Sequence, residues 1–423
     1  MFSFRDREFR VILFFFIISC VHSIGLMIAM IASLVLLKQG VRGAIKALLL
    51  IAIRTPLSPA IAVSFGSLQI FKWILIFGFC GVIIANSGGI PFDRKRRLNT
   101  SAFCLTIFCV IAAIGSFMNG SYPISALFKI ISYYIATIAI TRGIAATEKP
   151  DEYLSFCVMI ITPLMLISLP MIPFGKFRLI NGSFQGAFNH PNMCGIMCAI
   201  YISLLVMYKK YFDRGSTIIV VAVLVMLYLS ASRTGMIAAM ICLVIGYKYM
   251  FNRNTRLFVF AVGGIALLLM WPSVSEQMNA FLFKTGGNTS ILYSREGQMM
   301  TFLSKFRANP TMGSGFAVPY YPGIKDYSLN MDLQVEPGNL IWAVLGDCGI
   351  IGFISFILYF LVLTLSKFDY KKILFVAAPL LVSMGEMAFF SVNSIAILYY
   401  VMFGLYMFIE EPYEVNMDEP SSY

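Results

Sequence analysis

Three charged residues of this chain have the types and surroundings needed to bind and transform an anionic substrate. Arg233 stands in a Ser-Arg-Thr-Gly segment between two apolar runs, and Arg295 stands in a long polar segment further along. An arginine can grip a diphosphate through two parallel, charge-assisted hydrogen bonds. Glu336 ends the polar segment in Glu-Pro-Gly-Asn, where a carboxylate could act as a general base. Together these residues could stabilise a leaving diphosphate and accept a proton.

Each of these residues also has an ordinary structural interpretation, and the residue types alone leave both open. Arg233 could be a snorkelling side chain that marks the membrane boundary. Arg295 and Glu296 could form an exposed charged pair on an amphipathic helix. Glu336 could be a first-turn carboxylate of the helix that Pro337 begins. A shared location of these residues would favour the chemical interpretation.

A Gly- and Asn-rich segment runs from Arg178 to Asn192 and precedes another apolar run. We expect Arg178 to be a further diphosphate-binding residue. His190, or Asn189 before it, is placed to cap the helix that follows. With Asn192, Ser232 and Asn339, His190 is an expected supporting residue of the site.

The histidines and cysteines do not predict a metal centre. His190, Cys194 and Cys198 recur at helical spacing, but the first and last lie about 12 Å apart along a helix, so one ion cannot bind all three. The sequence also lacks a nucleotide-binding motif, and we expect neither a metal nor a cofactor. Glu386 and Lys129 lie within or near apolar runs and are further candidates, but the sequence assigns them no role.

The composition indicates a polytopic membrane protein. Hydrophobic residues make up 59% of the chain and charged residues 12%, with a mean hydropathy of +0.83, far from the values of soluble domains. The nine cysteines fall in apolar stretches, which gives no support to a disulfide framework. The net charge of +12 would suggest nucleic acid in a soluble protein. Here the basic residues cluster after alternate spans, as the positive-inside rule requires.

The apolar runs predict an all-α protein with about 12 transmembrane helices, since about 20 apolar residues cross a bilayer. The expected spans are residues 11–37, 67–86, 101–118, 123–141, 152–172, 191–208, 216–232, 234–250, 256–272, 339–366, 372–390 and 395–410. Residues 44–64 are apolar but are interrupted by Arg54, Pro56 and Pro59. A proline-interrupted helix with a mid-span arginine pairs poorly with lipid, so we favour a broken or interfacial helix there.

The basic clusters place both termini in the cytoplasm. We expect one membrane domain over residues 1–423, an extracytoplasmic loop over 273–338 embedded in it, and a disordered cytoplasmic tail over 411–423. This topology brings the segments around His190, Arg233 and Arg295, and the re-entry at Glu336, to the same outer side. That convergence is the strongest functional signal in the sequence.

The ordered set of motifs resembles the O-antigen ligase and polymerase superfamily of bacterial envelope polysaccharide assembly. The resemblance covers residues 178–353 and rests on Phe-Asn-His-Pro-Asn before a span, Ser-Arg-Thr-Gly at an outer turn, and a long loop with an early Arg. The loop contains Asn-Pro-Thr-Met-Gly-Ser-Gly and leads to Gly-Asp-Cys-Gly-Ile-Ile-Gly. The resemblance implies a glycosyltransferase C-type architecture and a metal-independent enzyme that uses undecaprenyl-diphosphate-linked saccharides as donors.

The resemblance also implies residue roles. Arg233 and Arg295 match the arginines that hold the donor's diphosphate in the family. In ligases a histidine followed by Asn opens the span after the long loop, whereas here Gly338 precedes Asn339. Glu336 is then the nearest candidate base, as in polymerase-like members with a carboxylate near this point.

We therefore expect a polymerase of a cell-surface polysaccharide (O-antigen, capsule or exopolysaccharide) in the bacterial cytoplasmic membrane, with its active site facing outward. It would transfer a growing glycan from undecaprenyl diphosphate to the next lipid-linked repeat unit. The alternatives are a ligase-type transfer to another acceptor and, in a different class, a lipid-linked oligosaccharide flippase or transporter. Expected partners are the lipid-linked oligosaccharide, the bilayer, and the flippase and chain-length regulator of the same pathway, with no nucleic acid.

Overall fold

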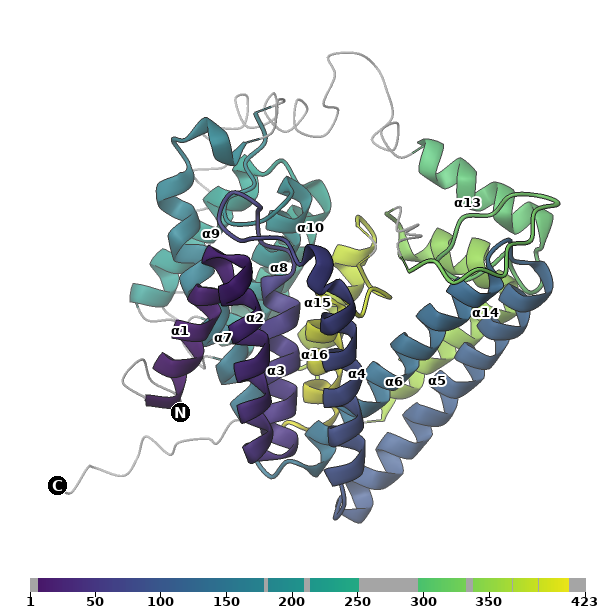
Figure 1. Ribbon diagram of the computed structural model, residues 1–423, viewed down its shortest axis with the longest axis horizontal. Helices are drawn as coiled ribbons and strands as arrows, with labels where there is room; N and C mark the ends of the chain where they lie inside the picture. The colour runs from purple at the N-terminus through teal and green to yellow at the C-terminus, as the bar shows by residue number, and fades with distance from the viewer. Residues whose placement is uncertain are drawn as a thin grey trace.

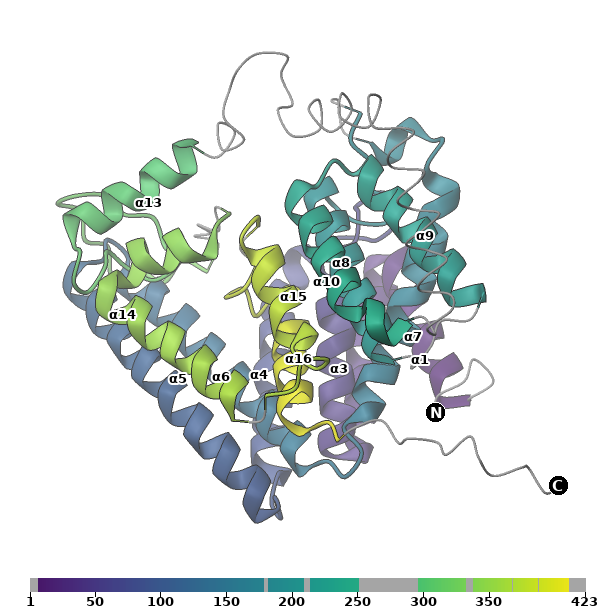
Figure 2. The same cartoon turned by 180° about the vertical axis from the view of Figure 1, so that it is seen from behind.

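The computed structural model describes residues 7–178, 182–208, 214–250, 296–331, 338–366, 368–386 and 388–410. Within these ranges the secondary structure is helical, as predicted, and β-type pairing is limited to two isolated bridges, Leu57 with Phe188 and Arg178 with Phe184. Figures 1 and 2 show most of the helices side by side in one bundle, with α13 (Glu296–Ala308) lying across its end beside α14 (Leu340–Leu365).

The helices of the bundle differ widely in length. They are α1 (Arg7–Val21), α2 (Ser23–Ser33), α3 (Val41–Arg54), α4 (Gln69–Asn86), α5 (Phe92–Asn119), α6 (Pro123–Ala146), α7 (Asp151–Ser168), α8 (Pro191–Tyr208), α9 (Arg214–Leu229), α10 (Arg233–Met250), α13 (Glu296–Ala308), α14 (Leu340–Leu365), α15 (Leu374–Ser383) and α16 (Ala396–Phe408).

Six helices in the described ranges are long and apolar enough to cross a membrane, against the twelve predicted spans. They contain α4 to α8 and α14, and five shorter apolar helices accompany them. The protein is therefore a multi-pass membrane protein. The predicted span 256–272, residues 273–295 and 332–337 of the predicted loop, and the predicted tail 411–423 lie outside the described residues.

The prediction of one span over residues 11–37 is wrong, because the chain turns at His22. Backbone angles there are extended (φ −151°, ψ 154°), and the His22 imidazole accepts a hydrogen bond from the Ile24 N–H, which caps α2. Gly25 lies so close to α1 that a Cβ would come within 2.5 Å of the Ile18 carbonyl oxygen. Two antiparallel helices replace the single span, and η1 (Leu34–Gln39) continues α2.

The segment 44–64 is broken by its prolines, as predicted, but its helix is not interfacial. α3 ends at Arg54, two residues before Pro56, and Ala44 to Leu49 are fully or almost fully buried. The two cations within residues 44–64 have partners on α1. Lys46 lies 2.9 Å from Glu8, and Arg54 donates to Ser19. These contacts let an arginine-containing helix pack inside the bundle instead of at its surface.

An irregular segment separates α15 from α16. The described residues between them include Phe389 and Phe390, which are buried among aromatic rings; Phe390 lies 4.6 Å from Phe316 between ring centroids. The Phe389 carbonyl accepts a hydrogen bond from Tyr400, and the Asn393 carbonyl accepts one from Lys72. Irregular backbone is tolerated at membrane depth when protein covers it. This interruption places Glu386 just after the end of α15.

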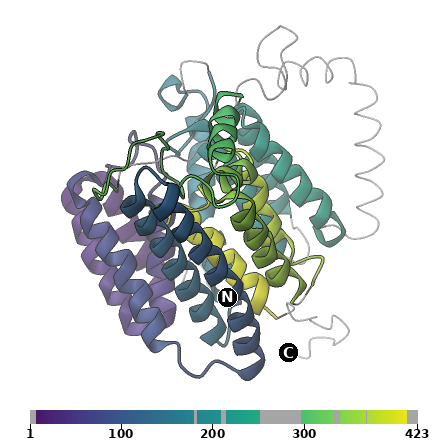
Figure 3. The ribbon, with the colours of Figure 1, turned by 90° about the vertical axis from the view of Figure 1, so that its right-hand side faces the viewer.

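The described part of the long loop packs on the ends of three helices. α13 lies near the start of α14, and the segment after it runs over the ends of α5 and α6 (Figure 3). Asn119 donates to the Gly313 carbonyl at 3.0 Å, and Ser121 bonds both the carbonyl and the N–H of Tyr321. The loop is therefore anchored to the bundle at the same end as the start of α14.

Candidate functional site

The first component of the site is the start of α8. Pro191 occupies the first helical position, where its missing N–H costs nothing. His190 caps the helix, since its Nδ1 accepts the Asn192 N–H at 3.1 Å, which confirms the predicted cap. Phe184, in the preceding loop, donates its N–H to the Leu229 carbonyl at 2.9 Å. This bond ties the Asn-rich segment to the end of α9.

The second component is the turn between α9 and α10. Ala231 has a positive φ of 52°, and Ser230 both donates to the Leu227 carbonyl and accepts the Ser232 N–H. α10 then begins at Arg233. Arg233 is half-buried at this helix start, and the first N–H groups of a helix and an arginine both favour an anion.

α8 and α10 start so close together that only small residues fit between them. A Cβ on Gly195 would lie 2.2 Å from the Ser232 Oγ, and a Cβ on Gly235 would lie 2.7 Å from the Gly195 carbonyl oxygen. Ser232 is buried in this contact. Its expected supporting role therefore has a physical basis, because it fixes the turn that presents Arg233.

The third component is Glu386, to which the sequence assigned no role. Its Oε1 accepts a hydrogen bond from Asn192 Nδ2 at 2.5 Å. The preceding residue, Gly385, packs directly on Thr234, where an added Cβ would come within 2.1 Å of the Thr234 Oγ1. The break after α15 thus brings a half-buried carboxylate to the starts of both α8 and α10. An acidic residue inside an apolar run was the sequence signal for it.

Other predicted site residues have different surroundings. Arg295 and Glu336 lie outside the described residues. Arg178 donates to the carbonyls of Ile172 and Gly182 in its own loop. These hydrogen bonds stabilise the conformation of that loop. Asn339 caps α14, since its Oδ1 accepts the Trp342 N–H at 3.3 Å from a positive-φ backbone.

The Asn-Pro-Thr-Met-Gly-Ser-Gly motif of the long loop and the Gly-Asp-Cys-Gly-Ile-Ile-Gly motif of α14 bind each other through their backbones. The N–H groups of Ser314 and Gly315 donate to the carbonyls of Gly346 and Asp347. They are therefore engaged with the protein backbone and do not form a phosphate cradle. α14 is interrupted at Gly349 (φ 66°, ψ −171°). The following N–H groups donate instead to the loop, to the carbonyls of Pro310 and Thr311.

A buried ion pair reinforces this junction. Lys305 of α13 lies 2.6 Å from Asp347 of α14, and both side chains are almost fully buried. Lys305 also donates to the Val318 carbonyl, and the second Asp347 oxygen accepts the Ala317 N–H. Lys129, the other candidate without a predicted role, donates to the Ala317 carbonyl at 2.6 Å. These charged groups therefore hold the loop to the bundle.

The donor and acceptor set at the start of α8 and α10 suits an anion and a proton transfer. It combines a guanidinium, helix N–H groups, an amide and a carboxylate. In the described part of the chain, His, Cys, Asp and Glu form no cluster of three that could hold a metal ion.

Comparison with known families agrees with the resemblance drawn from the motifs. Residues 218–357 match the model of a family described as O-Antigen ligase. The match includes nearly all of α9, the whole of α10 with Arg233, α13, and the first two thirds of α14. It supports a membrane enzyme of the O-antigen ligase and polymerase superfamily, whose members are glycosyltransferase-like enzymes of polysaccharide biosynthesis. No curated protein matches the chain.

Proposed function

We propose that this protein polymerises a cell-surface polysaccharide by moving a growing glycan from undecaprenyl diphosphate to the next lipid-linked repeat unit. The observation that carries the proposal is the hydrogen bond between Asn192 and Glu386 beside the start of α10. It gathers a carboxylate and an arginine-bearing helix start at one end of the bundle, within a family of polysaccharide enzymes.

In this proposal Arg233 and the first N–H groups of α10 hold the donor's diphosphate, with Arg295 as the second arginine and Arg178 bordering the site. The diphosphate leaves as an anion, so its departure needs charge stabilisation instead of protonation. Two arginines can supply that stabilisation without a metal ion.

The acceptor hydroxyl attacks the anomeric carbon while the bond from that carbon to the diphosphate oxygen breaks, and the configuration inverts. The hydroxyl proton passes to a carboxylate. Glu336 is the base that the family resemblance favours. Glu386 is the carboxylate that the described residues bring to α8 and α10. Glu336→Gln and Glu386→Gln, tested separately for chain elongation, decide between them.

Reconstitution tests the proposed reaction. Purified protein in liposomes, supplied with a lipid-linked repeat unit and a metal chelator, should give a ladder of products of increasing length. Arg233→Lys should leave single repeat units on the lipid, because lysine cannot grip a diphosphate bidentately. Long chains from both Arg233→Lys and Arg295→Lys would contradict the diphosphate-binding role.

A ligase is the near alternative within the same family. It would transfer a finished chain once to a different acceptor and give no ladder in this assay. Gly338 at the position of the ligase histidine favours the polymerase. A flippase would move the lipid-linked repeat unit across the liposome membrane and leave its length unchanged.

We further propose that His190 and Arg233 face the outside of the cytoplasmic membrane and that both termini lie in the cytoplasm. Single cysteines at the exposed His190 and at the exposed Lys95 test this orientation, in a variant whose native cysteines are replaced. A membrane-impermeant thiol reagent should label position 190, and not position 95, in intact cells with a permeabilised outer membrane. The reverse pattern would invert the topology.

A further inference from the structure

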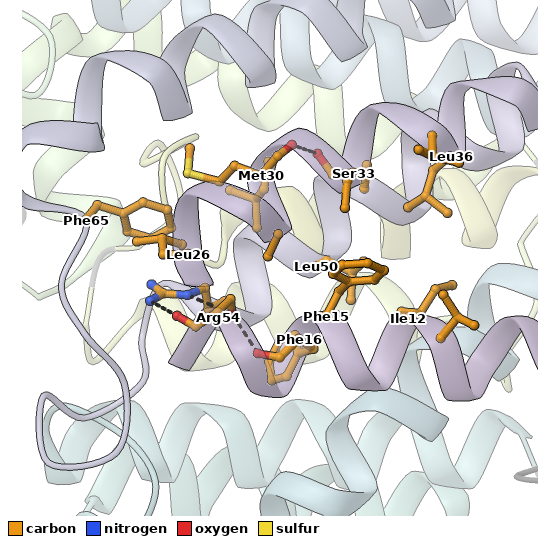
Figure 4. A pocket seen from close by; sticks show the side chains of 17 residues that line it. Ile12, Phe15, Phe16, Leu26, Met30, Ser33, Leu36, Leu50, Arg54 and Phe65 are labelled. Carbon is orange, nitrogen blue, oxygen red and sulfur yellow. Dashed lines mark hydrogen bonds between the residues drawn. The ribbon is translucent and has the colours of Figure 1, made fainter. Parts of the chain in front are cut away.

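An apolar pocket of about 190 Å³ lies between α1, α2 and α3 (Figure 4). Its walls are aliphatic and aromatic side chains, among them Phe16, Met30 and Leu50. Val11 and Val35, which also line it, are 48% and 59% exposed. These valines belong to the apolar outer surface of a membrane protein, so the pocket is accessible to a lipid chain from the bilayer.

One end of the pocket carries a buried arginine. Arg54 is 6% exposed and lies beside Phe65. Its Nε and Nη2 donate to the Ser19 hydroxyl, the Ser19 carbonyl and the Val63 carbonyl, at 3.2, 2.8 and 2.6 Å. Among the described residues, none accepts a hydrogen bond from Nη1 of this guanidinium. The group therefore keeps donors for a ligand.

A second buried cation shares the same aromatic ring. Lys72 Nζ lies 4.4 Å from the Phe65 centroid, and the Arg54 guanidinium carbon lies 4.5 Å from it. Lys72 also donates to the Asn393 carbonyl. Within the described residues, no carboxylate forms an ion pair with either cation. Burying a basic group in an apolar interior without an ion-pair partner is costly, and an anionic group would offset that cost.

The cationic end of the pocket is connected to the candidate site. Ser58, just after Arg54, donates its N–H to the Ala187 carbonyl, and Asn189 donates its N–H to the Pro56 carbonyl, both at 2.9 Å. Residues 187–189 run directly into the start of α8. An anionic head group at Arg54 would therefore lie at the same end of the bundle as Asn192 and Glu386.

We propose that this pocket binds the carrier lipid of the acceptor, with part of its prenyl chain among α1, α2 and α3 and its diphosphate at Arg54. This inference rests on the proposed polymerase reaction. That reaction joins two lipid-linked saccharides, so it needs a second diphosphate and chain site besides the one at Arg233. A diphosphate carries enough negative charge to compensate both Arg54 and Lys72, whereas a phosphodiester lipid carries a single charge.

Two variants and a control test the assignment. Arg54→Gln removes the charge, and Ala29→Phe fills the pocket from α2 and leaves Arg54 in place. Ile70→Phe, at a 63% exposed position of α4 outside the pocket, is the matched control. Elongation is measured with a fixed polymer-bearing donor and a labelled single-repeat acceptor, whose carrier is either full-length or a short water-soluble prenyl chain.

Arg54→Gln should raise the KM for both acceptors about tenfold or more, because it removes charge-assisted hydrogen bonds to the diphosphate. Ala29→Phe should raise the KM for the full-length acceptor only. The KM for the donor should stay at its wild-type value in both variants, and Ile70→Phe should leave all three constants unchanged. An unchanged acceptor KM in Arg54→Gln and Ala29→Phe would overturn the assignment.

A binding measurement separates this inference from the polymerase proposal. Native mass spectrometry of the detergent-solubilised protein uses undecaprenyl diphosphate as the probe and phosphatidylglycerol as the competitor. Both pocket variants should lose one bound undecaprenyl diphosphate that wild type retains against excess phosphatidylglycerol. Displacement by phosphatidylglycerol would identify a phospholipid site and contradict the acceptor assignment. A wild-type protein that binds the probe in this way but gives no ladder would contradict only the polymerase proposal.

Discussion

Asn192 Nδ2 donates a hydrogen bond to Glu386 Oε1 at 2.5 Å, across 194 positions of the sequence. The bond joins the first turn of α8 to the break that follows α15. Had residues 372–390 formed one continuous span, as predicted, Glu386 would belong to a regular helix. The break releases it from α15 and presents the carboxylate to two helix starts.

Replacing Glu386 by Gln should lower the elongation rate by about 10²- to 10⁴-fold if its carboxylate takes the acceptor proton. Asn192→Ala removes one hydrogen bond to that carboxylate and should cost about tenfold or less. Initial rates of product formation measure both effects. Asn86→Ala is the control, because Asn86 is exposed and its side chain bonds, within the described part of the chain, only to the Val82 carbonyl of its own helix. Wild-type rates in Glu386→Gln would exclude it as the base.

Gly385→Ala should disturb the site without changing any polar group. The added Cβ would meet Thr234 at 2.1 Å from Oγ1 and 2.4 Å from Cβ, so one of the two segments must shift. Overpacking of this kind costs about 1–3 kcal/mol, and we expect a comparable loss in elongation rate. Thr234→Gly in the same protein should restore part of the rate, because it removes all three contacting side-chain atoms of Thr234. A double variant as impaired as Gly385→Ala would locate the effect elsewhere.

The sequence predicts the helical membrane fold, the helix start at Pro191 and, to within one residue, the start of α10, because proline, capping residues and apolar runs act locally. It does not predict the turn at His22. Residues 11–37 are apolar on both sides of the turn, and the imidazole that caps α2 is a weak local signal.

The site itself depends on contacts between distant segments. Glu386 is visible in the sequence as a carboxylate in an apolar run, but its role depends on the break after α15 and on the fit of Gly385 against Thr234. Similarly, the Asn-Pro-Thr-Met-Gly-Ser-Gly and Gly-Asp-Cys-Gly motifs are both recognisable, whereas their mutual hydrogen bonds appear only in three dimensions.

Breaking the buried ion pair should loosen the long loop. Lys305→Met keeps most of the side-chain stem but leaves Asp347 buried without its cation, which costs about 3–5 kcal/mol. We expect a lower midpoint of thermal unfolding in detergent and faster proteolysis within residues 309–331. Lys325→Met is the control, since Lys325 is exposed and, among the described residues, donates one hydrogen bond, to the Met118 carbonyl. The double variant Lys305→Met with Asp347→Leu should lose less stability than the sum of the losses in the two single variants. Full additivity would show that the pair is uncoupled.

Gly349→Ala should weaken the same junction through the backbone. Gly349 has a φ of 66°, and an added Cβ would lie 2.4 Å from the Thr311 carbonyl oxygen. The strained backbone alone costs about 1–3 kcal/mol, and the clash pushes the loop away from α14. Gly81→Ala in α4 is the control because its Cβ would meet nothing within 4 Å, and alanine favours a helix by about 0.5–1 kcal/mol over glycine. Thermal unfolding should therefore shift downward for Gly349→Ala and stay level or rise for Gly81→Ala. If the midpoint of thermal unfolding of Gly349→Ala equals that of wild type, the loop can separate from α14 without loss of stability.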